Sequence, residues 1–254
     1  MSNRGILPLL TAALAALLPS GSFGAGLDRD TLLTEAPAVP NAGTVRVTGS
    51  ANGQASGAAD SGSTGGVSGN ILWAPIDRVA GDVGLYQQGP DGGPTVRVRF
   101  HLLKQSDVGI DLAIGARFKE FGFFRKQAGS PNGEFEYLLA LGKSFGHFDA
   151  MLNGVIGFEA GGPGSDLEGK AFLGYRFLPA VRAGIDGRLQ AEYKDEKGTK
   201  TPDFTNDVNL VAGPAVSWLL LRDNLQLQAL VGVAKPRGIS TVSPGGLLAA
   251  SLDF

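Results

Sequence analysis

The chain has 254 residues, of which 39 are Gly and none is Cys, and charged residues make up only 18%. Average proteins contain about 7% Gly and about 25% charged residues, so Gly is in excess and charge is scarce. Without Cys, the chain has no disulfide framework, thiolate metal site, cysteine nucleophile or lipidated N-terminal Cys. Its 22 basic and 24 acidic residues give a net charge of -2, which excludes a bulk electrostatic attraction to nucleic acid.

The first residues have the pattern of an export signal. Residues 1–25 carry Arg4, then an apolar run, then small residues, which predicts a secretory signal peptide. The apolar run is shorter than the roughly 20 residues that a membrane-spanning helix needs. Residues 26–43 are polar and contain Pro, and we expect a short periplasmic leader there. Residues 52–66 are rich in Gly, Ser and Ala, which predicts a flexible loop.

From residue 67 onward, apolar and polar residues alternate along the chain. In residues 108–118 every even-numbered position is apolar, whereas the odd positions include Asp111 and Arg117. This period of two predicts strands with one apolar and one polar face. The alternating runs are longer than the 5–6 residues that are common in soluble proteins, and they match the roughly 9–11 residues of a tilted strand that crosses a bilayer.

About twelve strands are expected. In chain order they cover residues 44–51, 67–76, 79–87, 95–103, 108–118, 134–144, 147–158, 166–177, 181–193, 207–220, 224–234 and 246–254. Short turns alternate with longer polar loops between them, as in outer-membrane barrels. We therefore expect an all-β fold: a closed antiparallel up-and-down transmembrane β-barrel over residues 44–254. Counts of ten to fourteen strands stay open, and a secreted soluble β-sandwich is the alternative fold.

Aromatic residues are expected near both rims of this barrel, where the two membrane interfaces would lie. Beside the short turns are Trp73, Phe145, Tyr175, Phe177 and Trp218, and beside the long loops are Tyr86, Phe118, Phe158 and Tyr193.

The last residues read Leu248-Ala-Ala250-Ser-Leu252-Asp-Phe254, an alternation that ends in Phe. With the signal peptide and the meander of long strands, this ending resembles the bacterial outer-membrane β-barrel superfamily. The resemblance implies a location in the outer membrane of a Gram-negative bacterium, in contact with lipid. It also implies that Phe254 is an assembly signal, read by the barrel-assembly machinery. We expect a monomer.

If the apolar faces meet lipid, the polar faces line the lumen. The expected lumen residues are Arg97, Arg99, Asp111, Arg117, Glu134, Glu136, Glu168, Lys170, Arg182, Asp186 and Arg188. Three groups of opposite charge are expected to meet across neighbouring strands: Arg97 and Arg99 with Asp111; Glu134 and Glu136 with Arg117 and Lys119; and Asp166, Glu168 and Lys170 with Arg182, Asp186 and Arg188.

Two functions fit such a lumen. The charged residues could form a selective eyelet in a narrow, passive channel or transporter for small solutes. Alternatively, they could close the lumen as a salt-bridged network, in a structural or adhesion-type barrel that interacts through its loops. We expect no enzyme, cofactor or metal site: His101 points inward by its parity, His147 falls in a short turn, and no Ser–His pattern is present.

Overall fold

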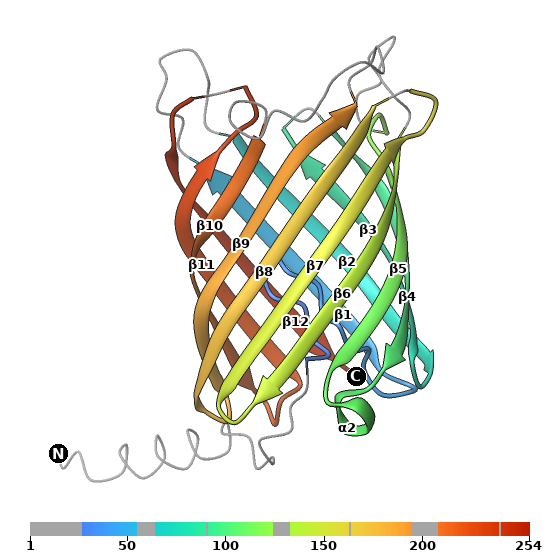
Figure 1. Ribbon diagram of the computed structural model, residues 1–254, viewed down its shortest axis with the longest axis vertical. Coiled ribbons are helices and arrows are strands. Elements are labelled where there is room, and N and C mark those ends of the chain that lie inside the picture. The colour runs from blue at the N-terminus through green and yellow to red at the C-terminus, as the bar shows by residue number, and fades with distance from the viewer. Residues whose placement is uncertain are drawn as a thin grey trace, which may run out of the picture.

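The computed structural model describes residues 27–54, 64–89, 91–123, 133–162, 164–194, 208–238 and 240–254. Within these residues, twelve strands form a closed barrel (Figure 1), and each strand is antiparallel to its neighbours. The expected fold is therefore confirmed. The expected signal peptide, residues 1–25, lies outside the described residues.

The strands alternate in direction along the chain. Their bounds are β1 Val45–Gln54, β2 Thr64–Ile76, β3 Val79–Gln88, β4 Asp91–Leu103, β5 Asp111–Glu120, β6 Gly133–Phe145, β7 Phe148–Glu159, β8 Ser165–Leu178, β9 Val181–Lys194, β10 Val208–Leu220, β11 Leu225–Lys235 and β12 Ser243–Asp253. Several strands extend further into the long-loop side than expected, because Gly-rich residues there still pair with a neighbouring strand.

One short turn contains a helix that alternation did not predict. Helix α2, Gln105–Val108, joins β4 to β5 and ends at Gly109, whose φ is 85°. The side chain of Asp111 accepts a hydrogen bond from the N–H of Gln105 at 2.9 Å. Strand β5 consequently begins at Asp111 rather than at residue 108.

The barrel closes where its first and last strands meet. Strands β1 and β12 pair over nine positions, from Arg46 opposite Asp253 to Gln54 opposite Gly245. The N–H of Phe254 also donates to the carbonyl of Val45 at 2.9 Å. Closure leaves no sheet edge unpaired, which a barrel in a bilayer requires. The role of Phe254 as an assembly signal stays a prediction.

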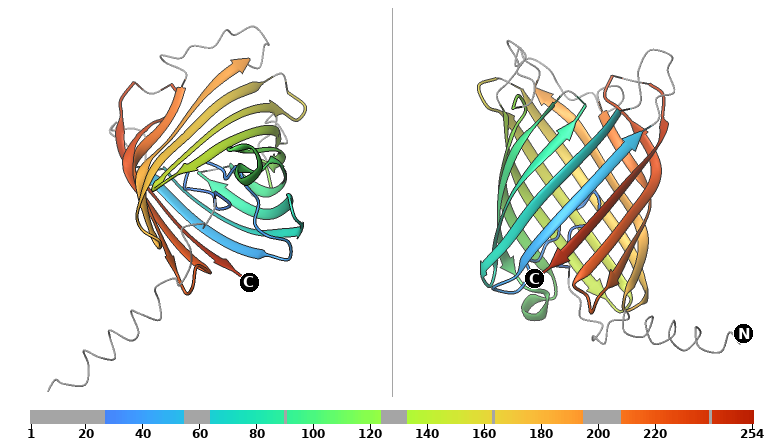
Figure 2. Two further views of the ribbon diagram at one scale, coloured as in Figure 1. Left: turned by 60° about the horizontal axis from the view of Figure 1, so that its bottom comes forward. Right: turned by 180° about the vertical axis from the view of Figure 1, so that it is seen from behind.

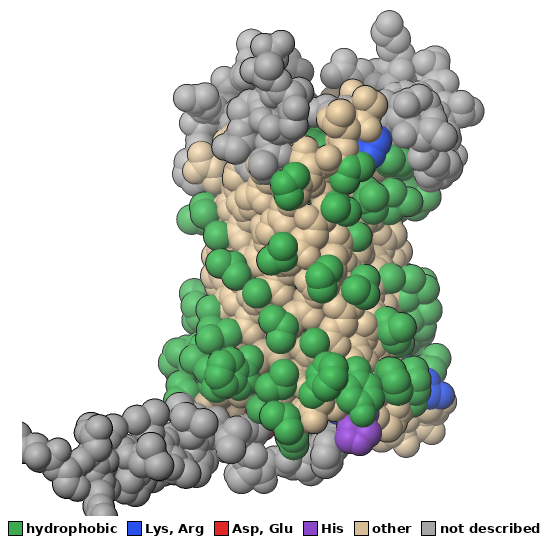
Figure 3. All heavy atoms as spheres, turned by 90° about the vertical axis from the view of Figure 1, so that its left-hand side faces the viewer, with side chains coloured by type: hydrophobic (Ala, Val, Ile, Leu, Met, Phe, Trp, Pro, Cys, Tyr) green, Lys and Arg blue, Asp and Glu red, His purple; other side chains and the backbone are tan. Residues whose placement is uncertain are grey.

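The outer surface is apolar. Large hydrophobic side chains are exposed around the wall, such as Trp73, Val83, Leu173 and Val231. The face in Figure 3 shows hydrophobic side chains over the wall and no Asp or Glu among the described residues. Tyr86 departs from the expected outer girdle, because it faces inward and donates to the carbonyl of Glu120 at 2.8 Å. The side chain of Tyr193 lies outside the described residues.

The residues before β1 occupy the barrel itself. Residues 27–40, called the strap from here on, lie inside the barrel (Figure 2), and residues 34–40 are buried. The expectation that residues 26–43 form a periplasmic leader is therefore wrong for this segment. Its carboxylates pair with lumen cations and its apolar side chains pack on the inner wall, so the lumen holds it. Residues 41–43 are exposed and connect it to β1.

Candidate functional site

The strap is a compact loop whose two ends meet. The N–H of Ala38 donates to the carbonyl of Leu27 at 3.1 Å, and the N–H of Thr31 donates to the carbonyl of Thr34 at 2.9 Å. The carboxylate of Asp30 accepts from the N–H of Ala36 at 2.8 Å. These bonds within the loop let it keep its shape as a unit.

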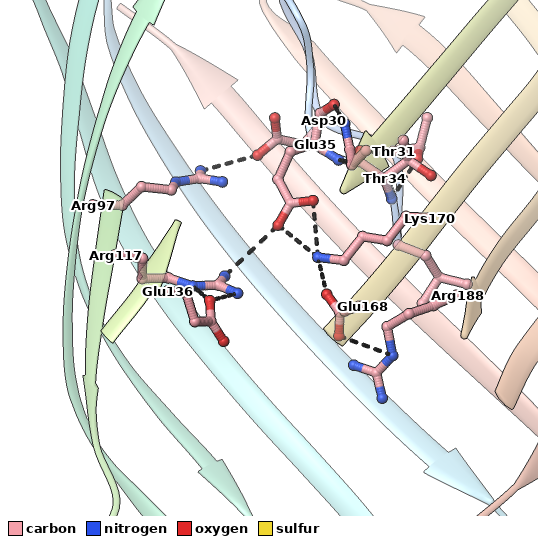
Figure 4. A network of polar contacts seen from close by, with 12 residues as sticks. Asp30, Thr31, Thr34, Glu35, Arg97, Arg117, Glu136, Glu168, Lys170 and Arg188 are labelled. Atoms are coloured by element: carbon pink, nitrogen blue, oxygen red, sulfur yellow. Dashed lines mark hydrogen bonds and ion pairs between the residues drawn. The ribbon is translucent and has the colours of Figure 1, made fainter. Parts of the chain in front are cut away.

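The first anchor of the strap is Asp30. Its two carboxylate oxygens contact Arg99 at 2.9 Å and Arg97 at 3.0 Å (Figure 4 shows the Arg97 pair). Arg97 also binds Asp82 of β3 at 2.7 Å. Burial alone raises the pKa of the Asp30 carboxyl, but Arg99 and Arg97 outweigh burial and hold this pKa well below its usual range. Asp30 is therefore a carboxylate at neutral pH.

The second anchor is Glu35. Its carboxylate contacts Lys170 of β8 at 2.7 Å and Arg117 of β5 at 3.8 Å (Figure 4). The backbone of Glu35 is held too, since its N–H donates to Asn153 at 2.7 Å and its carbonyl accepts from the same amide at 3.0 Å. Lys170 in turn binds Glu168 at 2.7 Å, and Glu168 lies 3.7 Å from Arg188.

Further contacts fix the tip and the base of the strap. Asp186 of β9 accepts from the hydroxyl of Thr34 at 2.7 Å and from the N–H of Leu33 at 2.9 Å. At the base, Arg29 pairs with Asp253 at 2.7 Å. Asp28 pairs with Arg46 at 3.2 Å. The strap is thus attached to strands around the barrel, with β1, β4, β8, β9 and β12 among them.

Apolar side chains of the strap fill recesses in the wall. Leu27 is buried with Met151 and Phe172, both of which point into the lumen. At Gly142 a Cβ atom would meet the ring of Pro37 and would lie 2.7 Å from Leu27. Val39 packs in a second cluster with Leu72, Ala74 and Ala80. Without the strap, these inward apolar groups would be exposed in a polar lumen.

A cavity of about 820 Å³ lies between the strap and the long-loop ends of the strands. Residues 30–35 of the strap form part of its lining. Its charged wall residues are Asp82, Arg97, Arg117, Lys119, Glu134, Asp166, Glu168, Lys170 and Arg188. On the other side of the strap, the space beside Arg29, Asp149 and Arg182 is about 30 Å³, enough for about two waters. The strap therefore lies between the large cavity and this small space near the short turns.

Two of the expected charge groupings differ from the structure. Asp111 does not meet Arg97 or Arg99; it contacts His101 at 2.9 Å and helix α2. The reason is the register, which places Arg97 opposite Arg117 and Arg99 opposite Gly115. Of the third group, Glu168 and Lys170 do lie beside Arg188.

Arg182 and Asp186 do not join this third group. Arg182 binds Asp149 at 3.3 Å and lies over the ring of Phe172, with 4.9 Å from the guanidinium carbon to the ring centre. Asp186 binds the strap.

The expected pairs between β5 and β6 are present. Arg117 lies opposite Glu136 and contacts its carboxylate. Lys119 lies opposite Glu134, with 3.0 Å between Nζ and the carboxylate, and also contacts Glu136. These four side chains form a chain of alternating charge along the lumen wall.

Sequence reasoning missed the strap residues of the site, above all Asp30, Thr34 and Glu35. The signal that could have revealed them is in the wall. Met151 and Phe172 are large apolar residues on inward-facing positions, where a water-filled lumen gives them no partner. Such positions require a segment that packs against them.

Among the described residues, no group of three or more His, Asp or Glu side chains could hold a metal ion. His101 is buried and contacts Asp111, and His147 lies in the turn between β6 and β7, stacked on Tyr175. No helix in the described part of the chain is long and apolar enough to cross a membrane.

Comparisons with known proteins resolve the fold but not the family. No protein-family model and no curated protein sequence matches the chain. Among solved structures, the KdgM porin aligns with a TM-score of 0.56 at 13% identity, over 82% of this chain and 99% of that chain. The NanC porin aligns with a TM-score of 0.58 at 8% identity, over 82% and 98%. The chain has the fold of the outer-membrane β-barrels.

The KdgM porin has also been solved in complex with disordered oligogalacturonate, and that structure aligns equally well, with a TM-score of 0.56. At 13% identity or less, such likeness establishes the architecture of the outer-membrane barrel and leaves its function to be argued from its own lumen.

Proposed function

We propose that the chain is a passive channel for small solutes in the outer membrane of a Gram-negative bacterium. The observation that carries this proposal is the cavity of about 820 Å³ inside the barrel, lined by charged side chains of both signs. Similar solved barrels are porins, which agrees with this reading. Passage through such a channel needs no reaction, cofactor or metal.

The mechanism follows from the lining. A solute that enters a narrow lumen loses part of its hydration, and charged rings replace some of the lost interactions. On one wall, Arg117, Lys119, Lys170 and Arg188 alternate with carboxylates. The solute-selecting residues are then those of the wall network, namely Arg97, Arg99, Arg117, Glu134, Glu136, Glu168, Lys170 and Arg188. Three further charged residues, Asp111, Arg182 and Asp186, lie nearer the short turns.

Conductance measurements test this proposal. Purified chain in planar bilayers is expected to give discrete current steps, and liposomes that contain it should take up small sugars. Arg117→Ala should lower the preference for anions, because it removes a cation from the cavity lining. Arg78→Ala is the matched control, since Arg78 is exposed at a short turn. An absence of current steps from the chain, and from the Asp30→Asn/Glu35→Gln variant described below, would contradict a channel.

A second function is favoured by a specific observation, the buried strap inside the barrel. In this reading the barrel is a closed structural or adhesion-type scaffold that interacts through its long loops. It predicts a folded barrel that never conducts, whatever is done to the strap. The same bilayer experiment therefore separates the two functions.

A further inference from the structure

We propose that the lumen wall carries two binding sites for carboxylates, and that the strap closes the channel by filling both with its own Asp30 and Glu35. The arginine site consists of Arg97 and Arg99, and the lysine site of Lys170 and Arg117. When the strap withdraws, small organic acids take the places of its carboxylates. This inference rests on the proposed channel function and names its solute class.

The charge balance of the wall supports two carboxylate sites beneath the strap. The ion pairs beneath the strap involve six wall cations, Arg97, Arg99, Arg117, Lys119, Lys170 and Arg188, and four wall carboxylates, Asp82, Glu134, Glu136 and Glu168. Asp166 also lines the cavity, but it pairs with Arg237. Asp30 and Glu35 are the two carboxylates that the strap adds to these ion pairs. The strap therefore neutralises a network that is otherwise positive by two charges, and it does so at the two points of excess.

Arg99 shows most clearly that the wall network depends on the strap for its charge balance. Its side chain is only 1% exposed, and its hydrogen bonds within the described residues go to the carboxylate of Asp30 and the carbonyl of Ala36. Its Nε and one terminal nitrogen have no hydrogen-bond partner among the described atoms. When the strap withdraws, Arg97 keeps Asp82 and Arg99 loses its carboxylate, so the arginine site holds one uncompensated positive charge that a solute carboxylate can neutralise.

The lysine site is built in the same way. Lys170 binds Glu35 through both carboxylate oxygens, at 2.7 and 2.8 Å. Its other carboxylate, Glu168, also faces Arg188, so the three wall groups keep one positive charge when Glu35 leaves (Figure 4). A solute with two carboxylates could engage both sites, whereas a neutral solute of the same size would gain nothing from them.

The strap is also built to move as one piece. Its ends are bonded to each other through Ala38 and Leu27, and residues 41–43 lead from it into β1. The described strap is therefore a closed loop that can leave its contacts together. The groups that the strap exposes to the cavity, residues 30–35, are those that a solute arriving from the long-loop side meets first.

The experiment uses the full chain in planar bilayers under a KCl gradient. Asp30→Asn/Glu35→Gln removes both strap carboxylates and keeps the side-chain sizes. We expect more frequent current steps than in the unmodified chain and a shift of the reversal potential towards chloride selectivity. Succinate should block this current, and succinamide, its neutral counterpart, should not. Asp107→Asn is the control, because it neutralises a carboxylate at the short-turn rim that pairs with Arg78 and not with the strap.

A reversible lock provides the second arm. The chain has no Cys, so Thr34→Cys/Asp186→Cys introduces one thiol on the strap and one on β9, where the native side chains touch at 2.7 Å. The oxidised form should be silent and the same sample should conduct after reduction. Current that is equal in both forms, with no selectivity change in the neutralised variant, would overturn the strap proposal and leave the channel intact. A heat-modifiable, folded barrel that stays silent in every variant would overturn the channel function itself.

Discussion

Asp30 forms ion pairs with two arginines of the lumen wall. These are Arg97 and Arg99, both of β4, and Arg97 also forms an ion pair with Asp82 of β3. Because these guanidinium groups outweigh burial, the pKa of Asp30 is lower in the folded barrel than in the unfolded chain. A lowered carboxyl pKa means that Asp30 contributes stability above the unfolded value of about 4, and that this contribution is lost only as the pH falls below it.

The pH dependence follows from this sign. Between pH 7 and pH 5 the strap should stay seated at the arginine site, so the current of the unmodified chain should not rise over this range. Opening by acid is expected only below about pH 4, where the carboxyl of a withdrawn Asp30, which has its ordinary pKa, takes up a proton and the seated form loses its advantage. Single-channel recordings at matched salt, from pH 7 to pH 3.5, check this. A rise in open probability centred near pH 6 would contradict it.

At the scale of elements, a glycine in a strand makes room for the strap. Strand β6 provides Gly142, where a Cβ atom would meet Pro37 of the strap. The pyrrolidine ring is rigid, so the strap must shift to make room. Strand β8 provides a comparison at Gly169, which is exposed and has no atom within 4 Å of a Cβ position.

Gly142→Ala should therefore loosen the strap, and Gly169→Ala should not. Overpacking of this kind typically costs about 1–3 kcal/mol, which would lower the occupancy of the seated strap. In the Thr34→Cys/Asp186→Cys background, Gly142→Ala should slow disulfide formation and raise the current before oxidation. Equal oxidation rates for the Gly142→Ala and Gly169→Ala proteins would show that the strap does not depend on this contact.

The sequence predicts the strands far better than the strap. Alternation places β3, β7 and β9 within a residue or two, because each strand obeys one local rule: apolar to lipid, polar to lumen. The strap has no period, and its order comes from tertiary contacts with strands around the barrel. The ion pairs show the same division. Those of Arg117 and Lys119 follow from strand register, whereas the partners of Arg99 lie in a segment distant in sequence.

At the scale of the whole molecule, closure between β1 and β12 is the step that completes the barrel. Ala250 lies in β12 between Gly49 of β1 and Leu227 of β11, and its side chain faces outward. A change there alters backbone pairing without altering lumen packing. No disulfide supports the fold, since the chain lacks Cys, so stability rests on this continuous pairing.

Ala250→Pro should weaken closure, because Pro removes an N–H donor from a strand with partners on both sides. The unmodified chain should migrate differently on a gel before and after heating. The Ala250→Pro protein should lose this difference at a lower temperature. Val242→Pro, just before β12, is the matched control and should behave like the unmodified chain. An Ala250→Pro protein as heat-resistant as the control would contradict the importance of this seam.

The short connection between the strap and β1 sets a threshold for opening. A group tethered by a few residues is present at its site at an effective concentration in the millimolar range or above. A free organic acid competes against that local concentration, and the strap returns as soon as the acid is diluted. The barrel would then admit acids only when their external concentration is high, and it would close again when that concentration falls. The length of the connection, residues 41–43, would set the concentration at which the channel opens.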